Sequence, residues 1–183
     1  MTYRLRPLYN LGGYLAALCL CLICALITAQ IVGRIVDRIA TGIGGDRIGL
    51  AIPGLSEVSG FLLVGASFLG LAYTFVNGGH IRVTLLIGRL PAAPRAVIEL
   101  FCLSVALLLG LYLGWYLYWL LADSIAFNES SYGLLSIPLW IPQSAMLIGI
   151  VLFCLALAEA WLATLVTAVT RPSRFTIDDS GQQ

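Results

Sequence analysis

The sequence has no lysine and only one histidine, and each absence excludes a kind of site. Without lysine there is no Walker-type phosphate loop, because that loop needs a lysine to reach the terminal phosphates of a nucleotide. A single histidine, His80, cannot supply both axial ligands of a bis-histidine haem within this chain. A structural zinc ion needs about four converging cysteine or histidine ligands, and the sequence shows no such cluster. We therefore expect no bound cofactor and no metal site.

Charged residues are equally scarce. They make up 10% of the 183 residues, whereas about 25% is usual in a soluble domain. Hydrophobic residues make up 60% of the chain, and the mean hydropathy is +0.98. A chain this apolar would expose too much hydrocarbon surface in water, so we expect an integral membrane protein surrounded by membrane lipids. The net charge of +1, without a dense basic patch, argues against nucleic acid as a partner.

All five cysteines, Cys19, Cys21, Cys24, Cys102 and Cys154, fall inside apolar runs. Cys21 and Cys24 have the spacing of a redox motif, but they lie in the middle of a predicted membrane span. Thiols in such a place are expected to behave as small hydrophobic groups. No set of nucleophile, base and orienting residue is visible, so we do not expect an enzyme. The alternative is a stand-alone four-span enzyme such as a quinone-linked thiol oxidoreductase, which would need cysteine pairs that water can reach.

Four apolar runs dominate the chain, and each reaches the roughly 20 residues that cross a bilayer as a helix. The sequence therefore predicts an all-α integral membrane protein in which residues 1–183 form a single four-helix membrane domain. The predicted transmembrane helices are residues 8–36, 57–77, 96–121 and 143–170, followed by a cytoplasmic tail at 171–183.

The segments between these runs carry residues that begin and end helices. Glycine and proline interrupt residues 41–56, which we expect to lie on the membrane surface. Ser56 is the predicted N-cap of the second helix, and Glu57 would be favoured by the positive end of the helix dipole. The other predicted connections are a helix end at Gly78 and Gly79, a short interfacial helix at 81–90, and a polar, proline-containing loop at 123–142.

Small residues recur at a spacing of four within two of the predicted helices. Ala66 and Gly70 form one such step, and Gly110 and Gly114 form another. A step of this kind allows two membrane helices to approach closely without polar contacts. We therefore expect helix–helix contacts at both steps.

The distribution of arginine predicts how the chain is oriented in the membrane. Four spans place both termini and the 77–95 loop on one side of the bilayer. That side would hold Arg4, Arg6, Arg82, Arg89, Arg95, Arg171 and Arg174, and the other side would hold Arg34, Arg38 and Arg47. Because the side richer in arginine usually faces the cytoplasm, both termini are predicted to be cytoplasmic. Glu57 and residues 136–142 would then face outward.

Glu159 is the one charged residue inside the fourth apolar run. An ionisable group at membrane depth is energetically expensive and suggests a functional role. One acid alone does not make an ion path, so we expect a carboxylate that is paired with an arginine or reaches water near the cytoplasmic end. The chain also shows no convincing internal repeat, which a transporter with its own substrate site would usually have. We therefore expect a membrane subunit without a substrate site of its own.

The stretch from Glu57 to Pro91 resembles the small membrane subunit, called DctQ-like, of tripartite ATP-independent periplasmic (TRAP) transporters. The resemblance rests on a glutamate at the start of the second span, a Leu-Gly pair near its middle, a Gly-x-His-Ile-Arg-Val turn after it, and a leucine-rich stretch closed by Leu-Pro. Residues 136–142, Ser-Ile-Pro-Leu-Trp-Ile-Pro, also resemble the segment before the family's fourth span, and the likeness covers roughly residues 8 to 170. The matching positions are Glu57, Leu69, Gly70, Gly79, His80, Arg82, Leu90, Pro91, Pro138, Trp140 and Pro142.

Three positions depart from the family pattern. Thr84 stands where members often have an acid, Asn77 where they often have a basic residue, and Ser56 where an acidic pair often opens the span. These departures affect the expected local salt bridges.

The resemblance implies a subunit of a secondary transporter in a bacterial inner membrane. A periplasmic binding protein would deliver an organic anion such as a carboxylate, and a large membrane subunit would carry it inward by symport with an ion. This chain would act as a scaffold, with Glu57, Gly79, His80, Arg82, Pro138, Trp140 and Pro142 at a subunit or lipid interface. The small subunit of a tricarboxylate-type tripartite system, which also has four spans, is a further alternative.

Overall fold

The computed structural model describes residues 3–43, 49, 53–78 and 92–170. Within these ranges the chain forms four α-helices and no strand, and each helix is long and apolar enough to cross a membrane. The helices are α1 (Arg6–Gly42), α2 (Leu55–Val76), α4 (Ala92–Ala126) and α5 (Trp140–Thr170). The predicted all-helical, four-span fold is therefore confirmed. The interfacial helix predicted at 81–90 and the 171–183 tail lie outside the described residues.

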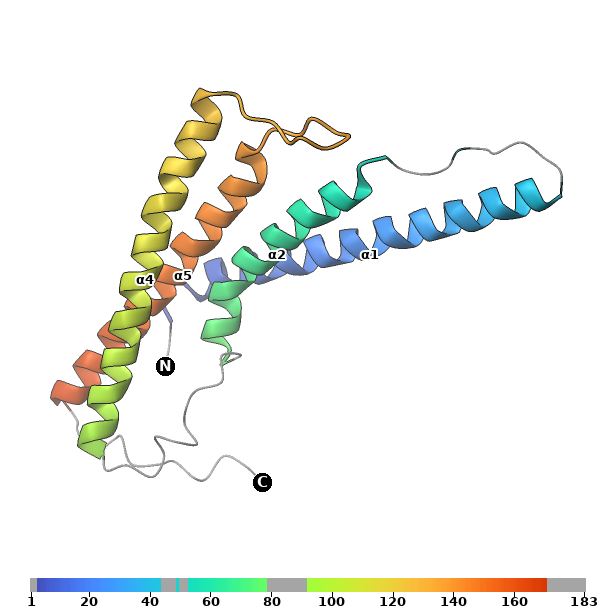
Figure 1. Ribbon diagram of the computed structural model, residues 1–183. Helices are drawn as coiled ribbons and strands as arrows, with labels where there is room; N and C mark the ends of the chain where they lie inside the picture. Colours follow the sequence, from blue (N-terminus) through green and yellow to red (C-terminus); the bar gives the residue numbers. More distant parts are fainter. Residues whose placement is uncertain (1–2, 44–48, 50–52, 79–91, 171–183) are drawn as a thin grey trace, which may run out of the picture.

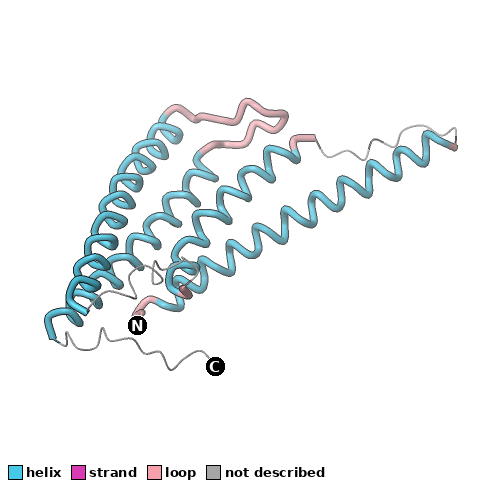
Figure 2. The backbone as a smooth tube through the Cα atoms, turned by 60° about the horizontal axis from the view of Figure 1, so that its bottom comes forward, coloured by secondary structure: helices cyan, strands magenta, loops and turns pink. Residues whose placement is uncertain are grey.

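The four helices form a single layer in the order α1, α2, α5, α4 (Figures 1 and 2). Helix α2 packs between α1 and α5, and α5 packs between α2 and α4. The N-terminal part of helix α1 runs alongside α2. The C-terminal part of α1 then projects away from α4 and α5 (Figure 1). In the most apolar window of α1 and of α4 only 6% of the residues are buried, compared with 22% for α2 and 28% for α5. The two edge helices thus expose most of their apolar surface.

The core lies where α1, α2 and α5 meet. One cluster joins Tyr9 of α1 to Ala72 of α2 and to Leu152 and Ala156 of α5. A second cluster, of Ala16, Ala66 and Leu69, continues the contact between α1 and α2. Most of these residues are small, which lets the helix backbones approach closely in a lipid environment that supplies no hydrophobic drive between helices.

The closest backbone approaches occur at glycines. A Cβ atom on Gly12 of α1 would lie 2.8 Å from the carbonyl oxygen of Leu69. A Cβ atom on Gly149 of α5 would lie 2.5 Å from the carbonyl oxygen of Phe68 in α2. Glycine at these two positions therefore determines how close α1 and α5 come to α2.

Both predicted small-residue steps lie at helix contacts. Ala66 is buried, and Gly70 faces Ala16 of α1. Gly110 and Gly114 face α5, where a Cβ atom on Gly110 would lie 2.8 Å from the sulfur of Cys154. Gly12 and Gly149 were not singled out from the sequence, although each stands four residues from an alanine, Gly12 before Ala16 and Gly149 after Ala145.

Several hydroxyl groups inside the helices bond to the helix backbone. Thr28 donates to the Cys24 carbonyl at 2.7 Å, and Ser67 donates to the Leu63 carbonyl at 2.8 Å. The hydroxyl group of Ser104 in α4 also makes a contact between helices. Its oxygen accepts a hydrogen bond from the indole N–H of Trp161 in α5 at 2.8 Å. Bonds of this kind satisfy polar groups where lipid cannot.

All four helices begin before the starts of the predicted spans, and two of these starts change the place of a predicted residue. Helix α2 begins at Leu55, and its N-cap is Gly54, with φ 74°, rather than Ser56. The left-handed backbone conformation at this position favours glycine, because glycine has no Cβ atom to clash. Helix α5 begins at Trp140, so Pro142 lies inside the first turn rather than in the preceding loop. Proline is tolerated there because first-turn N–H groups have no partner within the helix. The predicted glycine end of α2 is confirmed at Gly78, with φ 76°.

Candidate functional site

Residues 127–139 form a compact hairpin that joins α4 to α5, and we call this segment the hairpin. The Ser131 N–H donates to the Ile137 carbonyl at 2.9 Å, and the Leu139 N–H donates to the Glu129 carbonyl at 3.0 Å. The Ser124 hydroxyl, at the end of α4, donates to the Glu129 carboxylate at 2.7 Å. We call the end of the molecule where the hairpin lies the hairpin end. It is also the end at which α2 and α5 begin (Figure 1).

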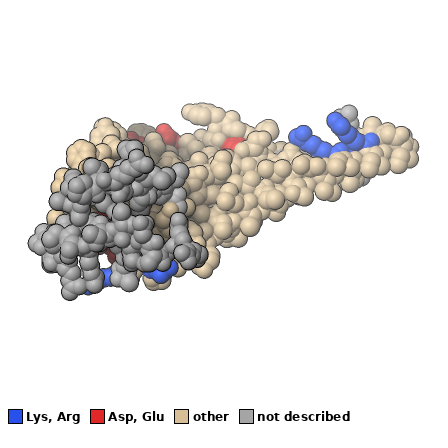
Figure 3. Space-filling model, turned by 90° about the horizontal axis from the view of Figure 1, so that it is seen from below, with Lys and Arg blue, Asp and Glu red and all other residues tan. Residues whose placement is uncertain are grey.

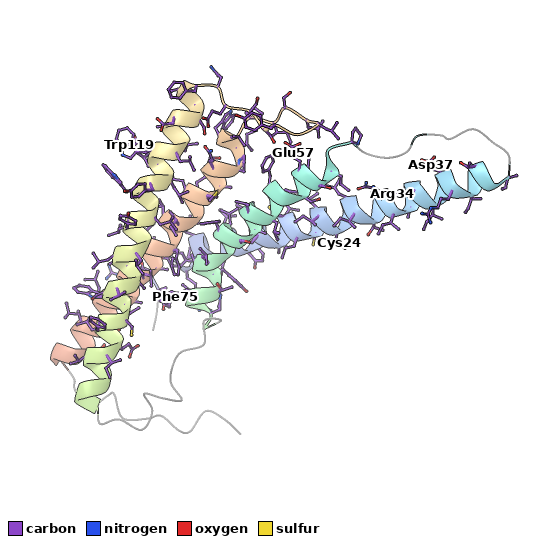
Figure 4. All side chains as sticks on the ribbon, in the orientation of Figure 1. Cys24, Arg34, Asp37, Glu57, Phe75 and Trp119 are labelled. Atoms are coloured by element: carbon purple, nitrogen blue, oxygen red, sulfur yellow. The ribbon has the colours of Figure 1, made fainter. Side chains whose placement is uncertain are left out.

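Glu57 of α2 lies directly against this hairpin (Figure 4). Its carboxylate fills the space that a Cβ atom on Gly133 would occupy. The Leu135 N–H makes a long hydrogen bond of 3.5 Å to Oε2 of Glu57. The other oxygen, Oε1, is buried and has no hydrogen-bond partner among the residues that the structure describes. The carboxylate therefore bridges two segments that lie 78 positions apart in the sequence.

Gly54 makes a second contact between α2 and the hairpin. A Cβ atom on Gly54 would lie 2.6 Å from Cγ of Leu135. Glycines on both sides of the contact, Gly54 and Gly133, thus allow the hairpin to lie on the first turn of α2. Glu57 also lies in that first turn, where a negative charge near the helix N-terminus contributes about 0.3–1 kcal/mol.

Three of the predicted interface residues, Pro138, Trp140 and Pro142, lie at the hairpin end. Pro138 pairs with Ser130 across the hairpin in an isolated bridge. Trp140 begins α5 with an exposed side chain, whereas Pro142 is buried. The hairpin contacts of Glu57 are with Gly133 and Leu135, which sequence analysis did not single out. The predicted interface residues Gly79, His80 and Arg82 lie outside the described part of the chain.

A buried polar pair lies far from the hairpin. The side chain of Tyr9 is fully buried, and its hydroxyl group lies near the carboxyl group of Glu159 without hydrogen-bonding to it. Neither the Tyr9 hydroxyl nor Oε2 of Glu159 has a hydrogen bond to another described residue. The surrounding cluster, which includes Ala72 and Ala156, is apolar. The pairing of Glu159 with an arginine stays a prediction, since several arginines lie outside the described ranges.

The distance between these two places shows that Glu57 and Glu159 belong to different sites. Glu159 lies 19 residues after Trp140, the first residue of α5. At 1.5 Å per residue this places Glu159 about 28 Å along the helix from the hairpin end. Two carboxylates this far apart cannot act on one substrate group.

The described residues form no metal-ligand cluster and no disulfide. Among them no group of three or more His, Cys, Asp or Glu side chains could hold a metal ion. All five cysteines lie in the described ranges and are free. Cys21 and Cys24 are exposed on the surface of α1 and Cys154 packs near Gly110.

Charge on the visible surface gathers near helix ends. On the face in Figure 3, basic side chains lie on the far part of α1, where Arg34 and Arg38 are exposed.

The apolar surface of α4 carries a group of exposed aromatic side chains, in which Tyr112 and Tyr116 have ring centroids 4.8 Å apart. Trp115 and Trp119 form an edge-to-face pair at 6.0 Å on the same helix. Such an aromatic group is typical of a membrane–water interface.

Comparison with known proteins found one family. A protein-family model described as "Tripartite ATP-independent periplasmic transporters, DctQ component" matches residues 23–167. No curated protein and no solved structure matches the chain. The matched range includes Glu57, the hairpin and Glu159.

Proposed function

Because the chain belongs to the DctQ component family of tripartite ATP-independent periplasmic transporters, we propose that it is the small membrane subunit of such a transporter. Its partners are a large membrane subunit and a periplasmic binding protein. The binding protein delivers an organic anion, such as a carboxylate, and the large subunit carries that anion inward by symport with an ion. The small subunit is a scaffold for the large one and does not carry substrate.

The observation that carries the scaffold role is the single layer of helices. Helices α1 and α4 leave most of their apolar surface uncovered, whereas α2 and α5 each pack along two neighbouring helices, and α1 also meets α5 around Tyr9. A layer of this kind presents two broad faces to other membrane components (Figure 2). The two acids that could take part in transport, Glu57 and Glu159, lie far apart along the helix direction. This separation supports a bracing role over a carrier role.

The proposed location is a bacterial inner membrane with both termini in the cytoplasm. The arginine distribution supports this orientation, because the side predicted to hold both termini carries the larger number of arginines. The hairpin and Glu57 then face the periplasm. His80 and Arg82, with Gly79 beside them, fix the cytoplasmic end of the second span against lipid phosphate or the large subunit.

The two alternatives have no observation in their favour. A quinone-linked thiol oxidoreductase needs paired cysteines that water can reach, and the five cysteines here are free and lie on the membrane-length helices. The family match is to a DctQ component, and no similar match points to a tricarboxylate-type subunit.

The test is reconstitution with partners. The genes beside this one should encode a large permease and a secreted binding protein, and both would be co-expressed with this chain. We expect the large subunit to co-purify with this chain, and uptake into liposomes to require this chain, the large subunit and the binding protein. Full uptake by the large subunit and the binding protein alone would refute the scaffold role. A different result would be a variant, at a residue facing the large subunit, that keeps the complex intact but loses uptake. That result would indicate that this subunit takes a direct part in transport.

A further inference from the structure

The tip of the hairpin exposes apolar side chains. Tyr132 is fully exposed, Leu134 is 81% exposed, and Phe127 at the base of the hairpin is 76% exposed. A large apolar side chain that remains in water forgoes about 1.5–3 kcal/mol of burial free energy. Three such side chains in one short segment indicate a surface that is covered in the assembled protein.

This exposed surface continues the apolar surface of the membrane helices. Ile125 is exposed at the end of α4, and Trp140 and Ile141 are exposed in the first turn of α5. The hairpin therefore joins the ends of two membrane-length helices, where a helix that spans a bilayer would meet the membrane–water boundary. Tyrosine and tryptophan are enriched at that boundary, because their rings sit at the level of the lipid headgroups.

The absence of charge on the tip favours lipid over a protein that binds and releases. No charged residue occurs between Glu129 and Glu159 in the sequence. Interfaces with dissociating protein partners usually have a polar rim, and complementary charges guide their association. The residues of the tip carry no charge, and none of them has a basic side chain for a phosphate group. It does offer the aromatic and aliphatic side chains that enter a headgroup layer.

Glu57 fixes where this tip lies. Its carboxylate packs against Gly133, between the two exposed residues Tyr132 and Leu134, and accepts the N–H of Leu135. Because Gly133 has no side chain, the carboxylate holds the backbone of the tip itself. The side chains on either side of Gly133 are then left free to contact the surroundings.

We propose that Tyr132 and Leu134 dock onto the phospholipid headgroup layer at the hairpin end of the molecule, with Glu57 as the residue that positions them. This proposal goes beyond the scaffold role and does not rest on it, since it requires only that the four helices span a membrane. Glu57 touches no lipid itself and acts by holding the hairpin on α2.

The test is site-specific photo-crosslinking in membranes that contain the large subunit and the binding protein. A benzophenone amino acid would replace Tyr132 in the full chain, and adducts would be identified by mass spectrometry. The matched control carries the same probe at Leu108, which is 67% exposed on the lipid-spanning part of α4. We expect a phospholipid adduct at position 132 with a yield similar to that at position 108. A dominant adduct with either protein partner, or no adduct at position 132 while position 108 reacts, would overturn the proposal.

A second arm tests the part assigned to Glu57. With the probe at position 132, Glu57→Ala should lose most of the lipid adduct, because the hairpin is no longer held on α2. Ser56→Ala, at the exposed neighbouring position, is the matched control and should keep the adduct. Size-exclusion chromatography checks that both variants stay folded. An unchanged lipid adduct in folded Glu57→Ala would overturn the positioning role. If Glu57→Ala fails to fold, the chain that carries the probe at position 132 and keeps Glu57 still tests the lipid contact.

Discussion

Replacement of Gly149 by alanine should loosen the central contact of the helix layer. The new Cβ atom would lie 2.5 Å from the carbonyl oxygen and 2.8 Å from Cβ of Phe68 in α2, whereas ordinary contacts begin at 3.4 Å. One of these atoms belongs to the backbone and the other to the root of a side chain, so neither can rotate away. Helix α5 must therefore move away from α2 by about 1 Å, and overpacking of this kind costs about 1–3 kcal/mol.

A smaller effect acts in the opposite direction. Alanine is favoured over glycine within a helix by up to about 1 kcal/mol. The net loss should therefore be up to about 2 kcal/mol, which lowers the melting temperature of a chain of this size by up to about 8 °C. The matched control is Gly60→Ala, because a Cβ atom at Gly60 meets nothing within 4 Å. That variant should melt at the wild-type temperature or slightly above it.

The assay is the thermal loss of the monodisperse size-exclusion peak of the isolated subunit in mild detergent. The two alanine variants differ only in what the added methyl group meets, so their difference in melting temperature isolates the contact with α2. If Gly149→Ala melts no lower than Gly60→Ala, then the close approach of α5 to Phe68 does not hold the layer together. That result would refute the role of Gly149 in setting the distance between α5 and α2.

Four further predictions concern the sites. Gly133→Ala should lower the melting temperature, measured by the same peak-loss assay, because its methyl group would displace the Glu57 carboxylate; an unchanged value would refute the contact. Tyr9→Phe should leave stability unchanged or raise it by up to about 1 kcal/mol, since it removes a buried hydroxyl without a hydrogen-bond partner; a clear loss of stability would mean that the hydroxyl has a partner. Glu159→Gln should keep uptake in reconstituted liposomes, as expected of a structural carboxyl group, and abolished uptake in an intact complex would indicate a role in ion coupling. The double variant His80→Ala with Arg82→Ala should lower the yield of complex with the large subunit in co-purification, and an unchanged yield and uptake would contradict the anchoring role.

The sequence was sufficient to predict the four helices, because membrane-length apolar runs admit few other structures. In lipid every backbone polar group must be bonded internally, so an apolar run of this length becomes a helix. The interior of each helix could thus be placed from composition, whereas the helix ends could not. Helix α2 starts at Leu55, after Gly54 in a left-handed conformation, and the side chain of Leu135 in the hairpin packs beside that glycine.

The candidate site at the hairpin end was predictable only in part. Glu57 and Pro138 could be assigned to the same side of the membrane from the order of the spans. Their relation to Gly133 could not be predicted, because the contact joins segments 78 positions apart and leaves no local pattern. The only local sign at Gly133 is a glycine between two large side chains, and glycine is common in turns that carry no tertiary contact. The layer order, in which α5 inserts between α2 and α4, is likewise a property of tertiary packing.

The length of α1 has a consequence for the bilayer itself. The uncharged run from Pro7 to Gly33 contains 27 residues, or about 40 Å of helix, which exceeds a hydrocarbon core of about 30 Å. To bury this run completely, the helix would have to incline by about 40° from the membrane normal, the upper limit of observed tilts. Such an inclined helix accommodates its excess length by tilt and has a wide footprint in the plane of the membrane. Because α1 projects away from α4 and α5 (Figure 1), this footprint lies on one side of the subunit.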